Sequence, residues 1–187
     1  MRVQIVLTCF TIVVSSIFLM NIGNLAFAIE YEKCGVTVQY PEGWKAENDD
    51  YQAEKLRSFV NLYPDPNDFS NLISIKIWDI SDYRQKTIEY VSEIFALPDS
   101  GGGIEITPIR NDITQVGGFP AQKAAYSDEF KGFKTYFMEI NILAYDKVYQ
   151  ISLEAEKQEK FDQYSPIVED IANSIKISKP NFEGINC

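Results

Sequence analysis

The chain has 187 residues, and its 45% hydrophobic content is enough to bury one sizeable core, so a single domain is the default expectation. It is acidic, with 27 Asp and Glu against 17 Lys and Arg and a formal net charge of −10, which disfavours nucleic acid or an anionic membrane surface as the main partner. The absence of histidine excludes Ser-His-Asp and Cys-His catalysis and histidine-ligated zinc or copper sites.

The N-terminal segment has the pattern of an export signal. Arg2 supplies a minimal positive charge, and residues 3–28 then contain no charged side chain. The segment ends in Ala-Phe-Ala, the small-x-small pattern that signal peptidase accepts. We therefore predict a signal peptide over residues 1–28 and a secreted or extracytoplasmic domain over residues 29–187. The alternative is membrane anchoring through residues 3–28, because the uncleaved run is long enough to span a bilayer.

The predicted mature domain retains two cysteines, Cys34 near its start and Cys187 at the end of the sequence. Outside the cytoplasm a pair of thiols usually becomes oxidised, and two cysteines allow one intramolecular connectivity. Domain termini often lie close together, which makes the closure geometrically reasonable. We predict a Cys34–Cys187 disulfide, with a free thiol pair or an intermolecular bond as the alternatives.

Three strand patterns occupy the first part of this domain. Residues 35–40 and 58–63 are runs rich in β-branched and aromatic side chains, and they end at Pro41 and Pro64. Residues 72–78 alternate Ile with Ser and Lys, as a strand with one buried face does. We predict a strand in each of these segments.

A helix is predicted over residues 81–95, with Ser81 or Asp82 as its N-cap. At 100° per residue Ile88 and Val91 fall on one arc, while charged residues occupy the opposite arc. This amphipathic pattern is typical of a helix that lies on a sheet.

The sheet is expected to centre on a long antiparallel hairpin over residues 134–155. Apolar and polar side chains alternate along both arms, and the arms are joined by turn-prone residues at 145–147. Another hairpin is predicted within residues 104–126. On the central hairpin the apolar face comprises Tyr136, Met138, Ile140, Ile142, Tyr149, Ile151 and Leu153, and the polar face comprises Glu139, Asn141, Gln150, Ser152 and Glu154.

Residues 157–176 predict a closing helical segment. Ser165 is a natural N-cap, and Pro166 would then stand at the first helical position, so two helices or one kinked helix are both compatible with the pattern. The order of elements predicts an α+β fold, with a central antiparallel sheet of six or seven strands and helices packed on both faces.

The best local cluster of oxygen ligands is Asp65, Asn67 and Asp68, which begins like a calcium loop. However, Phe69 occupies the third ligand position and Ser70 replaces the turn glycine, and a proline-fixed turn explains these residues equally well. Any metal site here would be a calcium site. No cofactor is expected.

Three segments resemble the PsbP-like family. Residues 35–44 read Gly-Val-Thr-Val-Gln-Tyr-Pro-Glu-Gly-Trp, similar to the opening strand and Tyr-Pro-x-x-Trp of that family. Residues 118–126 are similar to its Gly-x-Pro-Ala…Tyr strand, and residues 164–177 to its closing helix. The resemblance implies an antiparallel sheet with helices on both sides, and an exported, non-catalytic protein. Plant members of the family bind manganese or zinc partly through histidines, which this chain lacks.

The resemblance further implies an accessory protein-binding module at or outside the cell membrane, whose partner is another protein or a membrane complex. One alternative is a small-molecule or calcium-binding module with a pocket between the sheet and the 81–95 helix. The other is an unrecognised hydrolase, which the missing histidine and the absence of a Gly-x-Ser-x-Gly motif disfavour. The sequence carries no signal for the oligomeric state.

Overall fold

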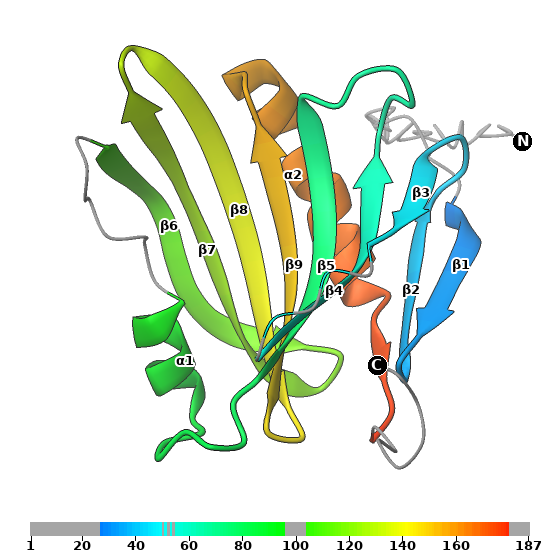
Figure 1. Ribbon diagram of the computed structural model, residues 1–187, viewed down its shortest axis with the longest axis vertical. Coiled ribbons are helices and arrows are strands. Elements are labelled where there is room, and N and C mark those ends of the chain that lie inside the picture. The colour runs from blue at the N-terminus through cyan, green and yellow to red at the C-terminus, as the bar shows by residue number, and fades with distance from the viewer. Residues whose placement is uncertain (1–26, 50, 52, 54, 96–103, 180–187) are drawn as a thin grey trace, which may run out of the picture.

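The computed structural model describes residues 27–49, 51, 53, 55–95 and 104–179 (Figure 1). A seven-stranded antiparallel sheet runs in the order β3-β4-β5-β9-β8-β7-β6, beside a three-stranded sheet in the order β1-β2-β10. The strands are β1 (Phe27–Lys33), β2 (Val36–Pro41), β3 (Lys45–Asn48), β4 (Leu56–Tyr63), β5 (Asn71–Asp79), β6 (Glu105–Val116), β7 (Phe119–Phe130), β8 (Phe133–Ala144), β9 (Lys147–Ala155) and β10 (Lys176–Ile177), and the helices are α1 (Ile88–Ile94) and α2 (Gln158–Asn173).

The central hairpin is confirmed as β8 and β9. Their register runs from Tyr136 opposite Ala155 to Ala144 opposite Lys147. The two-residue turn consists of Tyr145 and Asp146, both at positive φ, as a tight turn between right-twisted strands requires. The hairpin holds two adjacent inner positions of the seven-stranded sheet.

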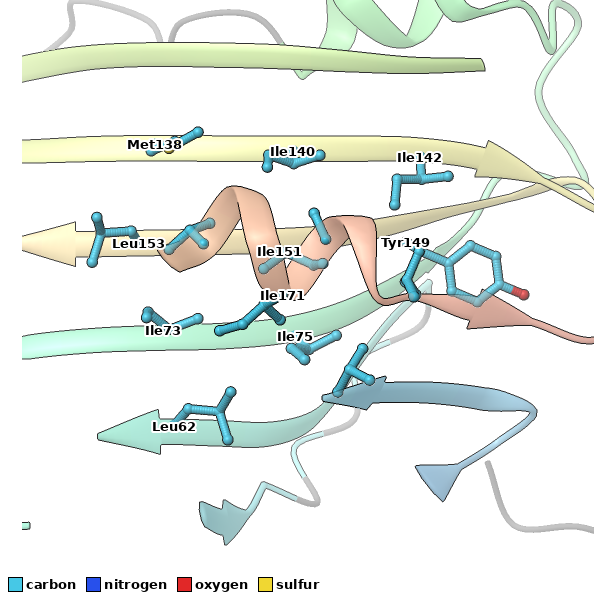
Figure 2. Close-up of a cluster of buried hydrophobic side chains, with 14 of the residues drawn as sticks. Leu62, Ile73, Ile75, Met138, Ile140, Ile142, Tyr149, Ile151, Leu153 and Ile171 are labelled. Atoms are coloured by element: carbon cyan, nitrogen blue, oxygen red, sulfur yellow. The ribbon is translucent and has the colours of Figure 1, made fainter. Parts of the chain in front are cut away.

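The main core lies between the large sheet and α2. Figure 2 shows side chains of β8 and β9 meeting those of β4 and β5, with Ile171 of α2 placed over them. The predicted apolar face of the hairpin is confirmed, because Ile140, Ile142, Ile151 and Leu153 are fully buried. Burial of one such side chain stabilises a fold by about 1.5–3 kcal/mol, so this layer determines which face of the sheet α2 covers.

Helix α2 is a single helix, which excludes the two-helix alternative left open by the sequence. Pro166 stands inside it, and Ser165 is not an N-cap, because its hydroxyl donates to the carbonyl of Phe161 at 2.6 Å. Tyr164 and Val168 are both buried on either side of the proline. The apolar face is therefore continuous across Pro166, and its packing on the sheet holds the helix together there.

Helix α1 is shorter than predicted. Its N-cap is Thr87, whose hydroxyl accepts a hydrogen bond from the N–H of Tyr90 at 3.3 Å, so the expectation of Ser81 or Asp82 is wrong. The N–H of Ser81 instead donates to the carboxylate of Asp79 at 2.9 Å. This hydrogen bond holds the residues that were expected to begin the helix in a turn at the end of β5. Helix α1 packs on the face opposite α2, so the expected helices on both faces are confirmed.

The small sheet was not predicted. Its β1–β2 hairpin turns at Cys34 and Gly35, and β10 pairs with β2 through Lys176 opposite Thr37. The predicted strand at 35–40 is therefore β2, and β1 begins at Phe27, inside the segment expected to be a leader. None of the helices in the described part of the chain is long and apolar enough to span a membrane.

Candidate functional site

The sheet face opposite α2 carries an unusual row of polar side chains. Gln122 of β7 and Asn141 of β8 have no exposed surface, and the Asn141 amide donates to Gln122 at 3.1 Å. Gln150 of β9 donates to Asn141 at 3.1 Å and to Glu139 at 3.3 Å. The hydroxyl of Tyr126 donates to the other oxygen of Glu139 at 3.2 Å. One hydrogen-bonded network thus connects three neighbouring strands and satisfies polar groups that water does not reach.

The network is held at its two ends by other elements. At one end, Gln122 donates to Asn111 of β6 at 2.9 Å and to Ser92 of α1 at 3.2 Å. At the other, the indole N–H of Trp78 in β5 donates to Gln150 at 3.3 Å. Because every inner member has partners on both sides, these side chains are fixed before any ligand arrives.

A hollow of about 150 Å³ opens on this face, next to the network. Side chains of β5, β7, β8 and β9 line it, and it is displaced along the strands from the position of α1. Its lining includes Ser74, Lys76, Tyr126, Glu139, Ser152 and Glu154.

Glu139 is the carboxylate of the hollow whose pKa burial changes most clearly. Burial raises the pKa of its carboxyl group, while the hydrogen bond from Tyr126 and the nearby charge of Lys76 partly offset that rise. Burial, together with the neighbouring Glu139 carboxylate, also raises the pKa of Tyr126. The pair therefore favours a protonated tyrosine whose hydroxyl donates to the carboxyl group.

The sequence predicted a pocket between the sheet and the 81–95 helix, and the described residues show what lies between the sheet and α1. That space is filled by buried apolar side chains, namely Ile80, Ile88, Val91 and Val148. Trp78 and Phe95 add an edge-to-face contact with ring centroids 5.3 Å apart. The hollow lies on the same face of the sheet, beyond this cluster.

The calcium candidates lie in the β4–β5 connection, with their oxygens directed to the turn itself. Asp65 accepts the N–H of Asn67 at 2.9 Å. Asp68 accepts the N–H of Ser70 at 2.9 Å and its hydroxyl at 2.5 Å, and these bonds lower the pKa of the Asp68 carboxyl group. Across the part of the chain that the structure describes, no three acidic or cysteine side chains gather as a metal site would require. The turn explanation accounts for this geometry without a metal.

The other predicted site residues are the two cysteines. Cys34 stands at φ 56° in the β1–β2 turn. Cys187 lies outside the described residues, so the disulfide stays a prediction.

Two exposed phenylalanines mark a second surface feature. Phe130 and Phe133 pair across the tip of the β7–β8 hairpin, and Phe133 is 80% exposed, the highest value among the large apolar side chains of the described residues. Strand β9 ends at Ala155 opposite Tyr136, so the last residues of the hairpin extend past it (Figure 1). These residues were not among the predicted site residues, although two phenylalanines flanking a turn-prone Lys-Gly pair were a detectable signal.

Sequence reasoning also missed the hollow. It placed Glu139, Gln150, Ser152 and Glu154 on one polar face, but it did not bring Lys76 or Tyr126 to them. The alternation along β5 and β7 was the available signal, because residues of the same parity share a face. Which strands become neighbours is decided only by the fold.

No protein-family model matches the sequence, and no curated protein matches it. Solved structures do match, and together with the sheet order they show an α+β fold of the PsbP-like type. The cyanobacterial PsbP protein CyanoP from Synechocystis sp. PCC 6803 aligns with a TM-score of 0.57 and 14% identity, over 80% of this chain and 92% of that one. The resemblance stated from the sequence motifs is thereby confirmed for the fold.

Two further structures share the architecture. The Ran-binding protein Mog1p of Saccharomyces cerevisiae aligns with a TM-score of 0.51 and 10% identity, over 80% of this chain and 94% of that one. A protein from Bacteroides thetaiotaomicron aligns with a TM-score of 0.55 and 13% identity, over 82% of this chain and 49% of its own. At these identities the likeness concerns the fold.

Proposed function

We propose that this chain is an exported, non-catalytic accessory domain that binds another protein, or a membrane complex, at or outside the cell membrane. The observation that carries the proposal is the pair Phe130 and Phe133 on a projecting hairpin tip. The fold adds support, since it is shared with the Ran-binding protein Mog1p. The missing histidine supports the non-catalytic part.

The tip has the properties of a binding element. A type I′-like turn at Lys131 and Gly132, both at positive φ, holds the two phenylalanines in fixed relation. Lys131 covers one face of the Phe130 ring at 5.0 Å from its centroid, and Lys134 follows directly after Phe133. We therefore expect the partner protein to present an apolar pocket bordered by acidic groups. Large aromatic side chains buried at the centre of an interface typically contribute most of its affinity.

The test is site-specific photo-crosslinking in cells that express the native chain. A photoreactive phenylalanine analogue at position 133 should give a discrete adduct with one protein, which mass spectrometry identifies. The matched control is position 69, because Phe69 is also well exposed (57%) but lies in the β4–β5 connection. With that partner purified, Phe133→Ser should weaken binding about 30-fold, the effect of losing a hot-spot residue, and Phe69→Ser should not. Equal crosslinking from positions 133 and 69 would contradict the assignment of the hairpin tip as the binding element.

Export is tested separately by the mass of the native protein. Cleavage after Ala28 leaves Ile29–Lys33 of β1 to pair with β2, so the hairpin retains most of its register. We expect the secreted form to begin at Ile29. A membrane-bound form that retains Met1 would instead support anchoring through residues 3–28.

A further inference from the structure

The hollow beside Glu139 owes its existence to two small side chains. Ser74 of β5 and Ser152 of β9 stand opposite each other in the register, and their hydroxyls are 2.8 Å apart. Larger neighbours surround them, among them Phe137 and Tyr126, whose rings stack at 5.0 Å with an interplanar angle of 19°. Short side chains between long ones leave a depression in the sheet face.

Most polar groups in the hollow already have partners. Both oxygens of Glu139 accept hydrogen bonds, and the Gln150 amide donates to two acceptors while its oxygen accepts from Trp78. A serine pair uses one hydroxyl hydrogen for its mutual bond and retains the other. These groups shape the wall and offer a ligand one free donor.

Two charged groups remain open. Within the described residues, Lys76 and Glu154 form no salt bridge, although both line the hollow. Lys76 pairs with Gln150 in the ladder and Glu154 with Leu72, so the two positions are four residues apart along adjacent strands, about 13 Å. Both side chains are long, so together they can reach a small ligand that lies between the two positions.

We propose that this hollow binds a free α-amino acid, whose carboxylate contacts Lys76 and whose ammonium group contacts Glu154. The remaining serine hydroxyl donates to the same ligand carboxylate, and the stacked Phe137 and Tyr126 rings form the wall against the ligand side chain. The volume of about 150 Å³ suits a small amino acid.

Other ligand classes fit less well. A phosphate would bring two negative charges to a site with two carboxyl groups on a chain of net charge −10. A metal cation would meet the Lys76 ammonium, and an apolar ligand would leave the charged groups without partners. A zwitterion balances both charges.

The test is titration of the purified chain with L-serine, followed by backbone NMR and calorimetry. We expect saturable shifts at residues 74, 137 and 152. Lys76→Met, which retains the aliphatic stem, should weaken binding about tenfold, as loss of a charged hydrogen bond does. Glu154→Gln should weaken it about threefold, because that carboxylate is exposed and screened.

Controls distinguish the zwitterion from its halves. Lys179→Met and Glu156→Gln change exposed charges that do not line the hollow, and they should leave the affinity unchanged. Acetate and ethylamine should each bind more weakly than L-serine. The proposal is overturned if L-serine gives no saturable shift at millimolar concentration, if acetate alone binds as tightly, or if both charge-removing variants bind like the unmodified chain.

Discussion

Ser178 is bound to the carbonyl oxygen of Gly35 by two hydrogen bonds, from its N–H at 2.8 Å and from its hydroxyl at 3.0 Å. This contact joins residues 143 positions apart in the sequence. It brings the chain that follows α2 to the β1–β2 turn, where Cys34 lies directly before Gly35. Cys187 follows nine residues later, and nine residues span at most about 30 Å, so the predicted bridge is within reach.

We therefore predict that protein secreted under oxidising conditions contains a Cys34–Cys187 disulfide. By the chain-entropy account, closing a loop of about 150 residues constrains the unfolded chain by roughly 5 kcal/mol. Cys34→Ser should lower the urea midpoint markedly, and Cys187→Ser should lower it equally. Peptide mapping without reductant checks the bond itself. Two thiols that both react in the folded, oxidised protein would contradict it.

A second prediction concerns the ion pair between Lys147 and Asp79, whose charged atoms are 2.7 Å apart. Burial alone would raise the Asp79 pKa, but hydrogen bonds from Lys147 and Ser81 lower it to about 2. Because the folded pKa lies below the unfolded value of 3.8, this stabilisation is present above pH 4 and is lost as the pH falls toward 2.

Asp79→Asn should therefore lower the free energy of unfolding at pH 7 by about 1 kcal/mol, a value reduced for solvent screening because the Asp79 side chain is 43% exposed. Urea unfolding at pH 7 and pH 2 measures the effect. The difference between variant and parent should shrink at the lower pH. A difference that is equal at both values would assign the effect to the turn rather than to the ion pair.

Glu139 should have the opposite effect on the pH dependence of the free energy of unfolding. Its folded pKa is raised by burial, so the stability that it contributes is fully present below its ordinary value of 4.5 and declines as the pH rises through the folded pKa. Glu139→Gln removes this titration. We expect the decline of unfolding free energy above pH 4.5 to become shallower in the variant. Parallel pH profiles for variant and parent would contradict a raised pKa.

The last prediction compares two buried tyrosines. The hydroxyl of Tyr149 finds no hydrogen-bond partner among the described residues, and burial raises its pKa to about 12. Tyr149→Phe should raise the free energy of unfolding by about 1 kcal/mol, because it removes an unsatisfied polar group. Tyr126→Phe should lower it by a similar amount, since the Tyr126 hydroxyl donates to Glu139. Thermal unfolding of both variants tests the contrast, and effects of the same sign would refute it.

Local patterns along the chain were sufficient to predict the central hairpin. The alternation of apolar and polar residues places Ile140 and Ile151 on the same face of the sheet, regardless of which strands become their neighbours. A period of two residues is already visible within a short stretch of sequence. The same reasoning located the β6–β7 hairpin, whose turn at Gly117 and Gly118 uses positive φ values that glycine adopts readily.

Contacts between distant segments decided the rest. Ile177 pairs with Val36 of the small sheet from the far end of the chain, and no local pattern encodes that partner. Helix α1 begins at its N-cap Thr87 rather than near Ser81, because Asp79 holds the Ser81 N–H. The sequence determined that Glu139 and Gln150 face away from α2. Only the tertiary structure brought Tyr126 and Trp78 from other strands to bury them, because hydrogen bonds across a sheet depend on strand order, which side-chain periodicity does not specify.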